Sequence, residues 1–356
     1  MRAHPYRPRA GSAVKPRPTA GRVARLTRDL ALRLTLTVVM VGTISCSVGE
    51  SSGPLTLSFG HVGAPGSLYA VTAEELARRV EVEMGERMRL QVFGSSQLGG
   101  DEVMLQKLRL GTLDMALPST VMSSNVAVFG LFELPYLVRD REHMRQIEAA
   151  VFWDRLAPQA QQRGFEILAV WENGFRHVTS NVRPVRTPDD LRGIKLRTPR
   201  GLWRVKMFQA YGANPSPMPM AEVFVALQTG VMDGQENPLT QIHSQQFQEV
   251  QTYLSLTGHV YTPAYVTFGA ARWSALPADI RQDLTRLARD MQTFVHQTAA
   301  SLDAELLSTL RSDGMQINDV DRQAFSAASR PIYEEFAAEV EHGGELLDAV
   351  SDAGAD

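Results

Sequence analysis

Two arginines and an asparagine are the residues of this 356-residue chain whose types and spacing suit the binding of an anion. Arg197 ends the alternating segment IKLR, Arg176 lies 21 residues earlier, and Asn237 lies 40 residues later, just past VMDGQ. A guanidinium can hold a carboxylate with two parallel hydrogen bonds, each worth about 1.5–3 kcal/mol. An amide offers donors and an acceptor to a carboxylate or a hydroxyl. Together, these three side chains would bind a small carboxylate.

Each of the three residues also suits an ordinary structural role. Arg197 could form a salt bridge to a nearby Asp or Glu, Arg176 could form a surface ion pair, and Asn237 precedes a proline as in many turns. Position makes Arg197 the best candidate of the three, because ligands of open α/β sheets gather at the carboxyl ends of strands, although a structural salt bridge is the commoner role of such an arginine. A cavity at that edge is what the functional interpretation requires.

The region after residue 54 begins with alternating strands and helices. Apolar patterning predicts strands at 55–61, 88–93 and 113–117, a helix from about Ser67, and a second helix, capped by Asp101, through Leu110. This β-α-β-α-β order predicts a mainly parallel sheet covered by helices.

The middle of the chain repeats that pattern in kind. Strands are predicted at 165–171, 194–197, 214–219, 231–235 and 265–271, and helices at 187–190, 201–211 and 220–229. Arg176 falls in a Gly-Phe-Arg turn after the first of these strands.

The last third of the chain is predicted to be helical. Pro277 suits the first position of a helix, and apolar residues mark one face of it from 278 to 311, about 50 Å at 1.5 Å per residue. Such a helix either crosses two lobes or breaks near the polar HQT at 296–298. A final helix is expected over about 322–349.

The N-terminus is predicted to be a targeting segment. Residues 1–33 hold nine Lys or Arg and one acidic residue, and the uncharged 12-residue run LTLTVVMVGTIS follows. A spanning helix needs about 20 residues, so this run fits a signal peptide instead. Cys46, the single cysteine, comes next, and TISC resembles a lipoprotein cleavage box apart from Thr43, where leucine is usual. Cys46 is then a lipid anchor, or else the signal peptide is cut nearby.

Composition argues against several classes of protein. After Cys46 the chain keeps 27 of its 36 basic and 38 of its 39 acidic residues, a net charge of −11. Binding of nucleic acid needs clustered Lys and Arg, so it is not expected, and a few local cations must hold any anionic ligand. The glycine-rich dinucleotide and phosphate motifs and the G-x-S-x-G nucleophile motif are absent from the sequence. One cysteine and eight scattered histidines predict no metal site.

Several segments resemble the DctP-type solute receptors that serve TRAP (tripartite ATP-independent periplasmic) transporters. The most specific is AEVFVALQTGVMDGQENP at 221–238, in which Phe224 stands where the family usually has tyrosine. GFR at 174–176 and KLRTP at 195–199 match two further motifs. Shorter likenesses are QLGG at 97–100, GTLDM at 111–115 and ELPY at 133–136, so the resemblance covers about residues 55–310.

The resemblance implies an α/β periplasmic binding protein fold with two lobes and a long C-terminal helix that spans both. A signal peptide at 1–46 and a linker at 47–54 precede the lobes. Lobe I then comprises 55–173 plus about 262–300, and lobe II comprises 174–261 plus about 301–350.

The resemblance also implies a receptor, not an enzyme, that binds a small organic acid between the lobes and delivers it to the membrane subunits of a TRAP permease. The residue matching Arg197 makes the two-pronged grip on the carboxylate, and those matching Arg176 and Asn237 complete the site. His61 and Ser119 would face the same cleft from the other lobe. No cofactor is expected, and the receptor would be a periplasmic monomer, tethered to the membrane if Cys46 is lipidated.

Two other functions are compatible with the sequence. The same receptor could feed a sensor kinase instead of a permease. Alternatively, a lyase or isomerase acting on a carboxylated sugar could use the arginines as substrate clamps. That enzyme would need a poised acid or base, and the sequence does not identify one.

Overall fold

The computed structural model of the chain describes residues 53–354. The expected signal peptide at 1–46, its Cys46 and most of the 47–54 linker lie outside the described residues. Within 53–354, no helix is both long enough and apolar enough to cross a membrane.

In this part of the chain, one mixed sheet has the strand order β2-β1-β3-β8-β4-β7-β5-β6, with β9 beside β8. β1 pairs parallel with β2 and β3, and β5 pairs parallel with β6 and β7. The antiparallel pair β4–β8 joins these two groups of strands. The strands are β1 (Leu55–Gly60), β2 (Met88–Phe93), β3 (Met115–Ala116), β4 (Phe165–Ser180), β5 (Lys195–Thr198), β6 (Asn214–Pro217), β7 (Gly234–Asn237), β8 (Tyr253–Gly269) and β9 (Gln316–Asn318).

Helices fill the connections between the strands. The α-helices are α1 (Leu68–Met84), α2 (Asp101–Leu110), α3 (Arg141–Ile147), α4 (Ala157–Gln162), α5 (Leu202–Ala210), α6 (Met220–Gln228), α7 (Leu239–Ser244), α8 (Ala270–Ser274), α9 (Ala278–Asp290), α10 (Gln292–Ser312), α11 (Arg322–Ala328), α12 (Arg330–Glu339) and α13 (Gly343–Asp352). A π-helix at Glu148–Leu156 links α3 to α4, and 3₁₀ turns lie at Thr120–Ser124, Ala127–Glu133, Pro188–Leu191 and Phe247–Glu249. Below, "first lobe" means the elements around β1–β3 and "second lobe" those around β5–β7.

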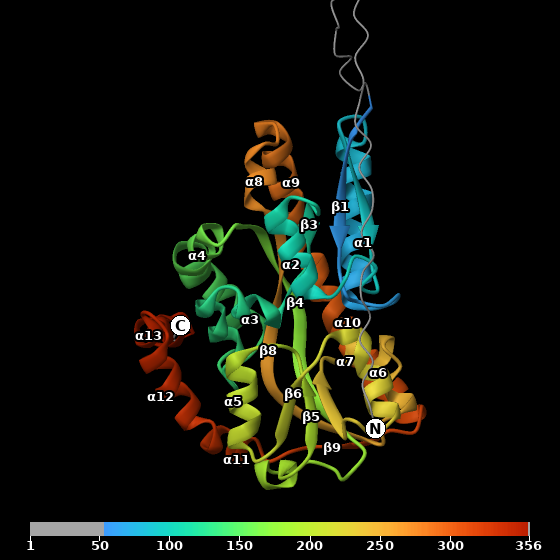
Figure 1. Ribbon diagram of the computed structural model, residues 1–356, viewed down its shortest axis with the longest axis vertical. Helices are drawn as coiled ribbons and strands as arrows, with labels where there is room; N and C mark the ends of the chain where they lie inside the picture. Colours follow the sequence, from blue (N-terminus) through green and yellow to red (C-terminus); the bar gives the residue numbers. More distant parts are fainter. Residues whose placement is uncertain (1–52, 355–356) are drawn as a thin grey trace, which may run out of the picture. The chain divides into compact units, whose positions relative to one another are not determined.

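The long strands β4 and β8 run side by side through both lobes (Figure 1). Phe165 pairs with Gly269 at one end and Ser180 with Tyr253 at the other, with three shifts of register between them. One shift lies at Gly174, whose φ of 120° suits glycine far better than other residues. β4 therefore bulges at this glycine and continues. The prediction of a turn at Gly-Phe-Arg is therefore wrong, because Arg176 lies within a strand.

Buried apolar side chains form three clusters. The largest packs β1–β3 and parts of β4 and β8 against α1, α2 and α9, and the two smaller clusters lie among the second-lobe elements. Side chains of α12 and α13 also belong to the largest cluster, namely Ile332, Phe336, Leu346 and Val350. The resemblance assigned residues 301–350 to lobe II. α12 also contacts α5 of the second lobe, where Lys206 pairs with Glu335 and Glu339, so this segment packs against elements of both lobes. The exact lobe boundaries stay a prediction.

The long helical segment expected at 278–311 consists of α9 and α10, interrupted at Met291 and not near 296–298. α10 contacts both α1 and α7, so it reaches elements of both lobes. An ion-pair network fixes it to the sheet, because Arg141 lies 2.7 Å from the Glu172 carboxylate on β4 and 2.6 Å from the Asp303 carboxylate on α10. The Glu172 side chain is fully buried, which shields its ion pair from water.

Other boundaries differ from expectation for local reasons. Gly100 precedes α2 as its cap residue, and Asp101 is the first residue of the helix rather than its N-cap. Asn237 is the last residue of β7 and does not follow a strand ending at 235. β8 begins at Tyr253, well before the predicted start at 265. The prediction missed its first half because Thr, Gly, His and Pro interrupt the apolar pattern there. The final helix expected at 322–349 is divided into α11, α12 and α13.

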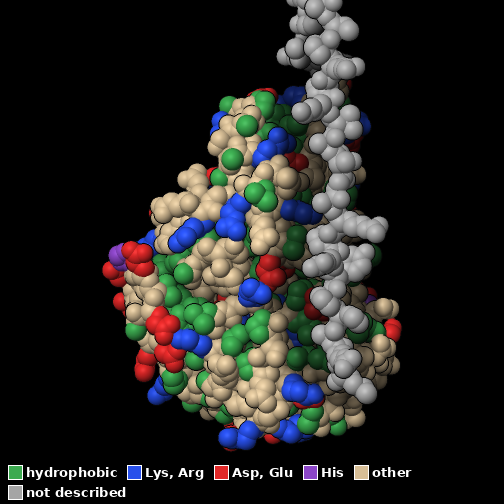
Figure 2. Space-filling model, in the orientation of Figure 1, with side chains coloured by type: hydrophobic (Ala, Val, Ile, Leu, Met, Phe, Trp, Pro, Cys, Tyr) green, Lys and Arg blue, Asp and Glu red, His purple; other side chains and the backbone are tan. Residues whose placement is uncertain are grey.

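Charged side chains of both signs cover the exterior. Figure 2 shows carboxylates gathered at the left, over α12 and α13, with Lys and Arg interspersed among other side chains on the rest of that face. The exposed acidic residues of these two helices include Glu334, Glu335, Glu339 and Glu345. Exposed ion pairs are worth about 0–1 kcal/mol each, so they contribute little to the stability of the fold.

Candidate functional site

A cavity lies at the carboxyl ends of β1, β3, β5 and β6. Its walls come from α1 and α2 of the first lobe, from β5, β7 and α7 of the second, and from β4, which both lobes share. The empty space, including the mouth that opens to solvent, is about 530 Å³. The lining residues are Val62, Tyr69, Asp101, Glu102, Ser119, Thr120, Val121, Asn173, Arg176, Arg197, Pro199, Arg200, Met218, Pro219, Met220, Asn237 and Gln241.

Arg197 lies near the end of β5 and is only 2% exposed. Its Nε and Nη2 both donate to the backbone oxygen of Met218, at 2.9 and 2.5 Å. Its Nη1 is buried without a protein partner, and within residues 53–354 no carboxylate forms an ion pair with it. Burial lowers the pKa of Arg197 to about 9, although Glu236 and Asp101 oppose that shift, so the side chain is a cation at pH 7. The edge formed by Nη1 and Nη2 is therefore left for a ligand.

Arg176 projects from β4 into the same cavity, but its charge is matched within the protein. Its Nε donates to Oε2 of Glu236 at 2.5 Å and its Nη2 donates to Oε1 of Glu236 at 3.0 Å. Its Nη2 also donates to Oδ1 of Asn237 at 3.0 Å. Sequence reasoning offered a surface ion pair as the alternative for Arg176, and the pair that the structure shows is fully buried.

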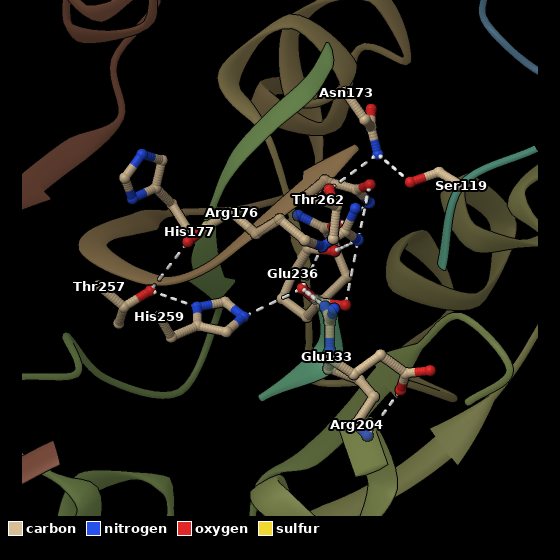
Figure 3. Close-up of polar contacts among 12 residues, drawn as sticks. Ser119, Glu133, Asn173, Arg176, His177, Arg204, Glu236, Thr257, His259 and Thr262 are labelled. Carbon is tan, nitrogen blue, oxygen red and sulfur yellow. Dashed lines mark hydrogen bonds and ion pairs between the residues drawn. The ribbon is translucent and has the colours of Figure 1, made fainter. Parts of the chain in front are cut away.

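Glu236 on β7 is the centre of a buried polar cluster (Figure 3). Besides Arg176, its carboxylate accepts from Nη1 of Arg204 at 2.7 Å and lies 3.1 Å from Nε2 of His259. Burial alone raises the pKa of Glu236, but the two guanidiniums and the histidine outweigh it and hold that pKa well below its usual range. Burial lowers the pKa of His259 to about 4, so the ring is neutral at pH 7. The neutral ring donates from Nε2 to Glu236 and accepts at Nδ1 from Thr257, 2.7 Å away.

Asn237 reaches the cavity because β7 pairs antiparallel with β4, where it lies opposite His177. Its Oδ1 accepts from Arg176, and its Nδ2 donates to Oε1 of Gln235 at 2.5 Å. The amide thus lies beside Arg176 at the wall of the cavity, held by its neighbours on both sides.

The two residues expected to face the cleft from the other lobe are placed differently. Ser119 lines the cavity, and its side chain does not cap the turn that follows. His61 does not line it: the ring is buried, lies 6.3 Å from the ring of Tyr69, and borders a separate cavity that includes Gly94. Burial lowers the pKa of His61 to about 4. The structure therefore brings four of the five expected residues together and leaves His61 outside the cavity.

Sequence reasoning missed several polar residues of the cavity wall. Tyr69, Asn173 and Gln241 were not singled out, and Asp101 was assigned only to helix capping. The one available signal was that Asn173 directly precedes the GFR motif. Burial raises the pKa of Asp101 to about 7, with a further contribution from the charge of Glu102 and an opposing one from Arg197.

The arrangement suits an anion better than a metal ion. Arg176 and Arg204 share the ionised Glu236, whereas Arg197 has a free edge and no carboxylate partner among the described residues. Over residues 53–354, no group of three or more His, Cys, Asp or Glu side chains is placed to hold a metal ion. The cavity can therefore neutralise a carboxylate at one fixed position.

A cavity between two α/β lobes with an uncompensated buried cation is the site of a solute-binding protein. Within that class, the chain belongs to the bacterial extracellular solute-binding protein family 7 (DctP), whose model matches residues 59–339. The family expected from the sequence is thus confirmed.

Relatives and solved structures agree with this assignment. The chain is 30% identical over 326 residues to the 2,3-diketo-L-gulonate-binding periplasmic protein YiaO of Escherichia coli strain K12, with 91% of this chain and 99% of that protein covered. A TRAP periplasmic solute-binding protein from Polaromonas sp. JS666, bound to D-erythronate, is 34% identical with a TM-score of 0.81, covering 85% of this chain and 100% of that chain.

A second solved structure is similar to the same extent. The sugar acid-binding protein DctPAm of Advenella mimigardefordensis strain DPN7T, in complex with galactonate, has a TM-score of 0.81 and 30% identity, covering 85% of this chain and 99% of that chain. These likenesses confirm the two-lobed α/β fold with a long C-terminal helical segment.

Proposed function

We propose that this chain binds the carboxylate of a small organic acid in the cavity between its lobes and delivers the acid to the membrane subunits of a TRAP-type permease. The observation that carries the proposal is the free edge of Arg197, a buried cation without a carboxylate partner within residues 53–354. Such a charge is costly to bury alone, and an anionic ligand removes that cost.

The expected binding geometry follows from the bonds that Arg197 already makes. Met218 occupies the Nε–Nη2 edge of the guanidinium, so the carboxylate would accept from Nη1 and Nη2. Two parallel charge-assisted bonds fix both the position and the plane of the carboxylate. Arg176 and Asn237 would add donors from the side, in orientations that Glu236 and Gln235 hold fixed.

Binding would also draw the lobes together. A ligand held by Arg197 from the second lobe and by Tyr69 or Ser119 from the first contacts both walls of the cavity. A ligand can shift an open–closed equilibrium only through its different affinities for the two forms. Contacts with both lobes supply that difference, and the permease subunits would recognise the closed form.

The remaining parts of the proposal concern the whole receptor. Family membership supports export to the periplasm, a role without covalent chemistry, and a monomer that diffuses to its permease. Whether Cys46 carries a lipid is a further part of this proposal, and it would decide between a free and a tethered receptor.

Calorimetry with Arg197 variants tests the proposal. A thermal-shift screen of organic acids against the protein starting after Cys46 first identifies ligands. Arg197→Ala should then weaken binding at least a hundredfold, because two charge-assisted bonds of about 1.5–3 kcal/mol each are lost. Arg197→Lys should rescue only part of this loss, since an ammonium lacks the two-pronged geometry.

The matched control is Arg192→Ala, because Arg192 is an exposed arginine whose only ion pair among residues 53–354 is with the exposed Asp189. It should bind like the unmodified protein. Circular dichroism and thermal unfolding of each variant show whether the fold is retained. Unchanged affinity in a folded Arg197→Ala variant would refute the proposed site.

A further inference from the structure

The hydrogen bonds around Asn173 fix which way its amide points. The hydroxyl of Ser119 donates its one proton to the backbone oxygen of Pro263, at 2.6 Å, and the hydroxyl of Thr262 donates its proton to the backbone oxygen of Gly174, at 3.2 Å. Both hydroxyl oxygens can therefore only accept from Asn173, and they lie 3.3 and 3.2 Å from its Nδ2. Figure 3 shows these two contacts converging on the nitrogen.

As a result, the oxygen of the Asn173 amide is an acceptor without a donor in the described part of the chain. The residue is 6% exposed and lines the cavity, and its Oδ1 is buried with no hydrogen-bond partner among residues 53–354. If the amide were rotated, Nδ2 would take the place of Oδ1. Oδ1 would then face the hydroxyl oxygens of Ser119 and Thr262, neither of which has a proton left to donate to it. An unmet buried acceptor costs about 1–3 kcal/mol, so a ligand that donates to it is favoured.

Within the part of the chain that the structure describes, two more acceptors on the cavity wall have no partner. They are Oδ1 of Asp101, at the start of α2, and Oε1 of Gln241, on α7. Glu102 also lines the cavity, and it pairs with Arg200 at 3.1 Å, so the one further arginine of the wall is already engaged. Away from Arg176 and Arg197, the described part of the wall therefore offers three unpartnered acceptors and the negative charge of Asp101, beside the hydroxyls of Tyr69 and Thr120, which can donate as well as accept.

This distribution distinguishes among organic acids. The second carboxylate of a dicarboxylate brings only acceptors and another negative charge, which Asp101 would repel. A hydroxyl group brings a proton and no charge, and each acceptor of the wall can receive it. Burial raises the pKa of Asp101 to about 7, so this carboxyl group is still ionised in part at neutral pH.

Building on the proposed function, we propose that the ligand is a monocarboxylate with hydroxyl groups, and that Asn173 determines specificity by accepting from one of those hydroxyls. Arg197 binds the carboxylate common to all organic acids, and Asn173 selects the hydroxylated ones. Ser119 and Thr262 act as positioning residues, because they hold the amide in the one orientation that leaves Oδ1 free.

Four-carbon acids provide a matched set of probes. D-Erythronate carries hydroxyls, butyrate is the same chain without them, and succinate replaces them with a second carboxylate; gluconate, hexanoate and adipate form the equivalent six-carbon set. Calorimetry on the protein starting after Cys46 should show the hydroxylated acid binding at least about tenfold more tightly than either analogue in the set that fits the cavity.

Variants then assign the preference to Asn173. In Asn173→Ala, the ratio of affinities for the hydroxylated acid and its deoxy analogue should fall about tenfold. Thr262→Val, which removes one of the two hydroxyls that orient the amide, should lower this ratio by a smaller factor. The control is Asn214→Ala, which removes an exposed asparagine outside the cavity and should leave the ratio unchanged.

A charge variant gives an independent readout. Asp101→Asn removes the negative charge but keeps an acceptor, so the dicarboxylate should gain affinity while the hydroxylated acid changes little. Circular dichroism verifies the fold of each variant.

The outcomes separate this inference from the proposed function. If the dicarboxylate binds as tightly as the hydroxylated acid, or if Asn173→Ala weakens all three acids by the same factor, the inference is wrong although the receptor binds acids through Arg197. If no acid binds, or if Arg197→Ala changes nothing, the proposed function itself is wrong.

Discussion

The two arginines of the cavity differ in what neutralises their charge. Arg176 forms a buried, two-pronged pair with Glu236, whereas Arg197 donates to a neutral backbone oxygen and keeps an edge free. The first arrangement is complete without a ligand and the second is not. We therefore assign Arg176 mainly to the stability and orientation of the site, and Arg197 to the ligand.

This difference predicts that Arg176→Ala destabilises the folded protein. Removing one partner of a buried ion pair leaves an uncompensated charge and typically costs about 3–5 kcal/mol. Because Arg204 and His259 still contact Glu236, the expected loss is at the lower end, about 3 kcal/mol. Urea denaturation should show a lower midpoint with little change of slope.

The control for this substitution is Arg192→Ala, which breaks an exposed pair and should change the free energy of unfolding by less than about 0.5 kcal/mol. Equal denaturation midpoints for Arg176→Ala and Arg192→Ala would contradict the assignment of Arg176 to stability.

Residue types and motifs were enough to single out Arg176, Arg197, Asn237 and Ser119 from the sequence. They were not enough to separate the roles of the two arginines, because that depends on Glu236 and on a backbone oxygen of Met218, which no motif encodes. His61 was expected in the cavity because it follows a strand, but that position does not show that its ring lies beside the ring of Tyr69, outside the cavity. Asn173 was missed because its role comes from two hydroxyls that are distant in the sequence.

At the scale of elements, the position of β7 depends on Gly234. A Cβ at this residue would lie 2.3 Å from the backbone oxygen of Thr179 on β4. That oxygen belongs to a paired strand, so it cannot move aside as the end of a flexible side chain could. The missing side chain thus allows the two strands to pair, and this pairing places Glu236 and Asn237 beside Arg176.

We therefore expect Gly234→Ala to lower the free energy of unfolding by about 1–3 kcal/mol, the usual cost of overpacking, and to weaken ligand binding. The control is Gly344→Ala in α13, where an added Cβ meets nothing within 4 Å. Alanine is a better helix former than glycine by about 1 kcal/mol, so this variant should be neutral or more stable. Thermal unfolding and calorimetry measure both effects, and a Gly234→Ala variant as stable as the Gly344→Ala variant would disprove this account of the strand pairing.

Sequence patterns located short elements well and long ones poorly. The strand at 88–93 was predicted to the residue, because its edges coincide with changes in polarity. The strand predicted at 165–171 stops before Gly174, and the strand predicted at 265–271 omits the first half of β8. Glycine and proline in a sequence indicate turns even where a paired strand accommodates them. The interruption at Met291 has no counterpart in the apolar pattern, which continues across it.

For the whole molecule, the shared strands predict a single unfolding transition. β4 and β8 contribute to both lobes, and α10 contacts elements of both, so neither lobe retains its sheet when the other unfolds. Differential scanning calorimetry should show one peak for the protein starting after Cys46. A ligand at a hundredfold excess over its Kd should shift that whole peak upward, with a stabilisation of about 2.7 kcal/mol. Two resolved peaks, only one of which responds to ligand, would disprove the coupling.

The place of β8 in the sheet has a consequence for how the polypeptide is made. β3, near residue 115, pairs with β8, near residue 268, and β4 has β8 as its longest partner. While the ribosome is still producing the middle of the chain, these early strands lack the neighbour that completes them. Contacts between segments so far apart in sequence form slowly, because a long loop must close first. We therefore expect the sheet to be completed only after β8 has been synthesised, so that final folding follows synthesis of the chain.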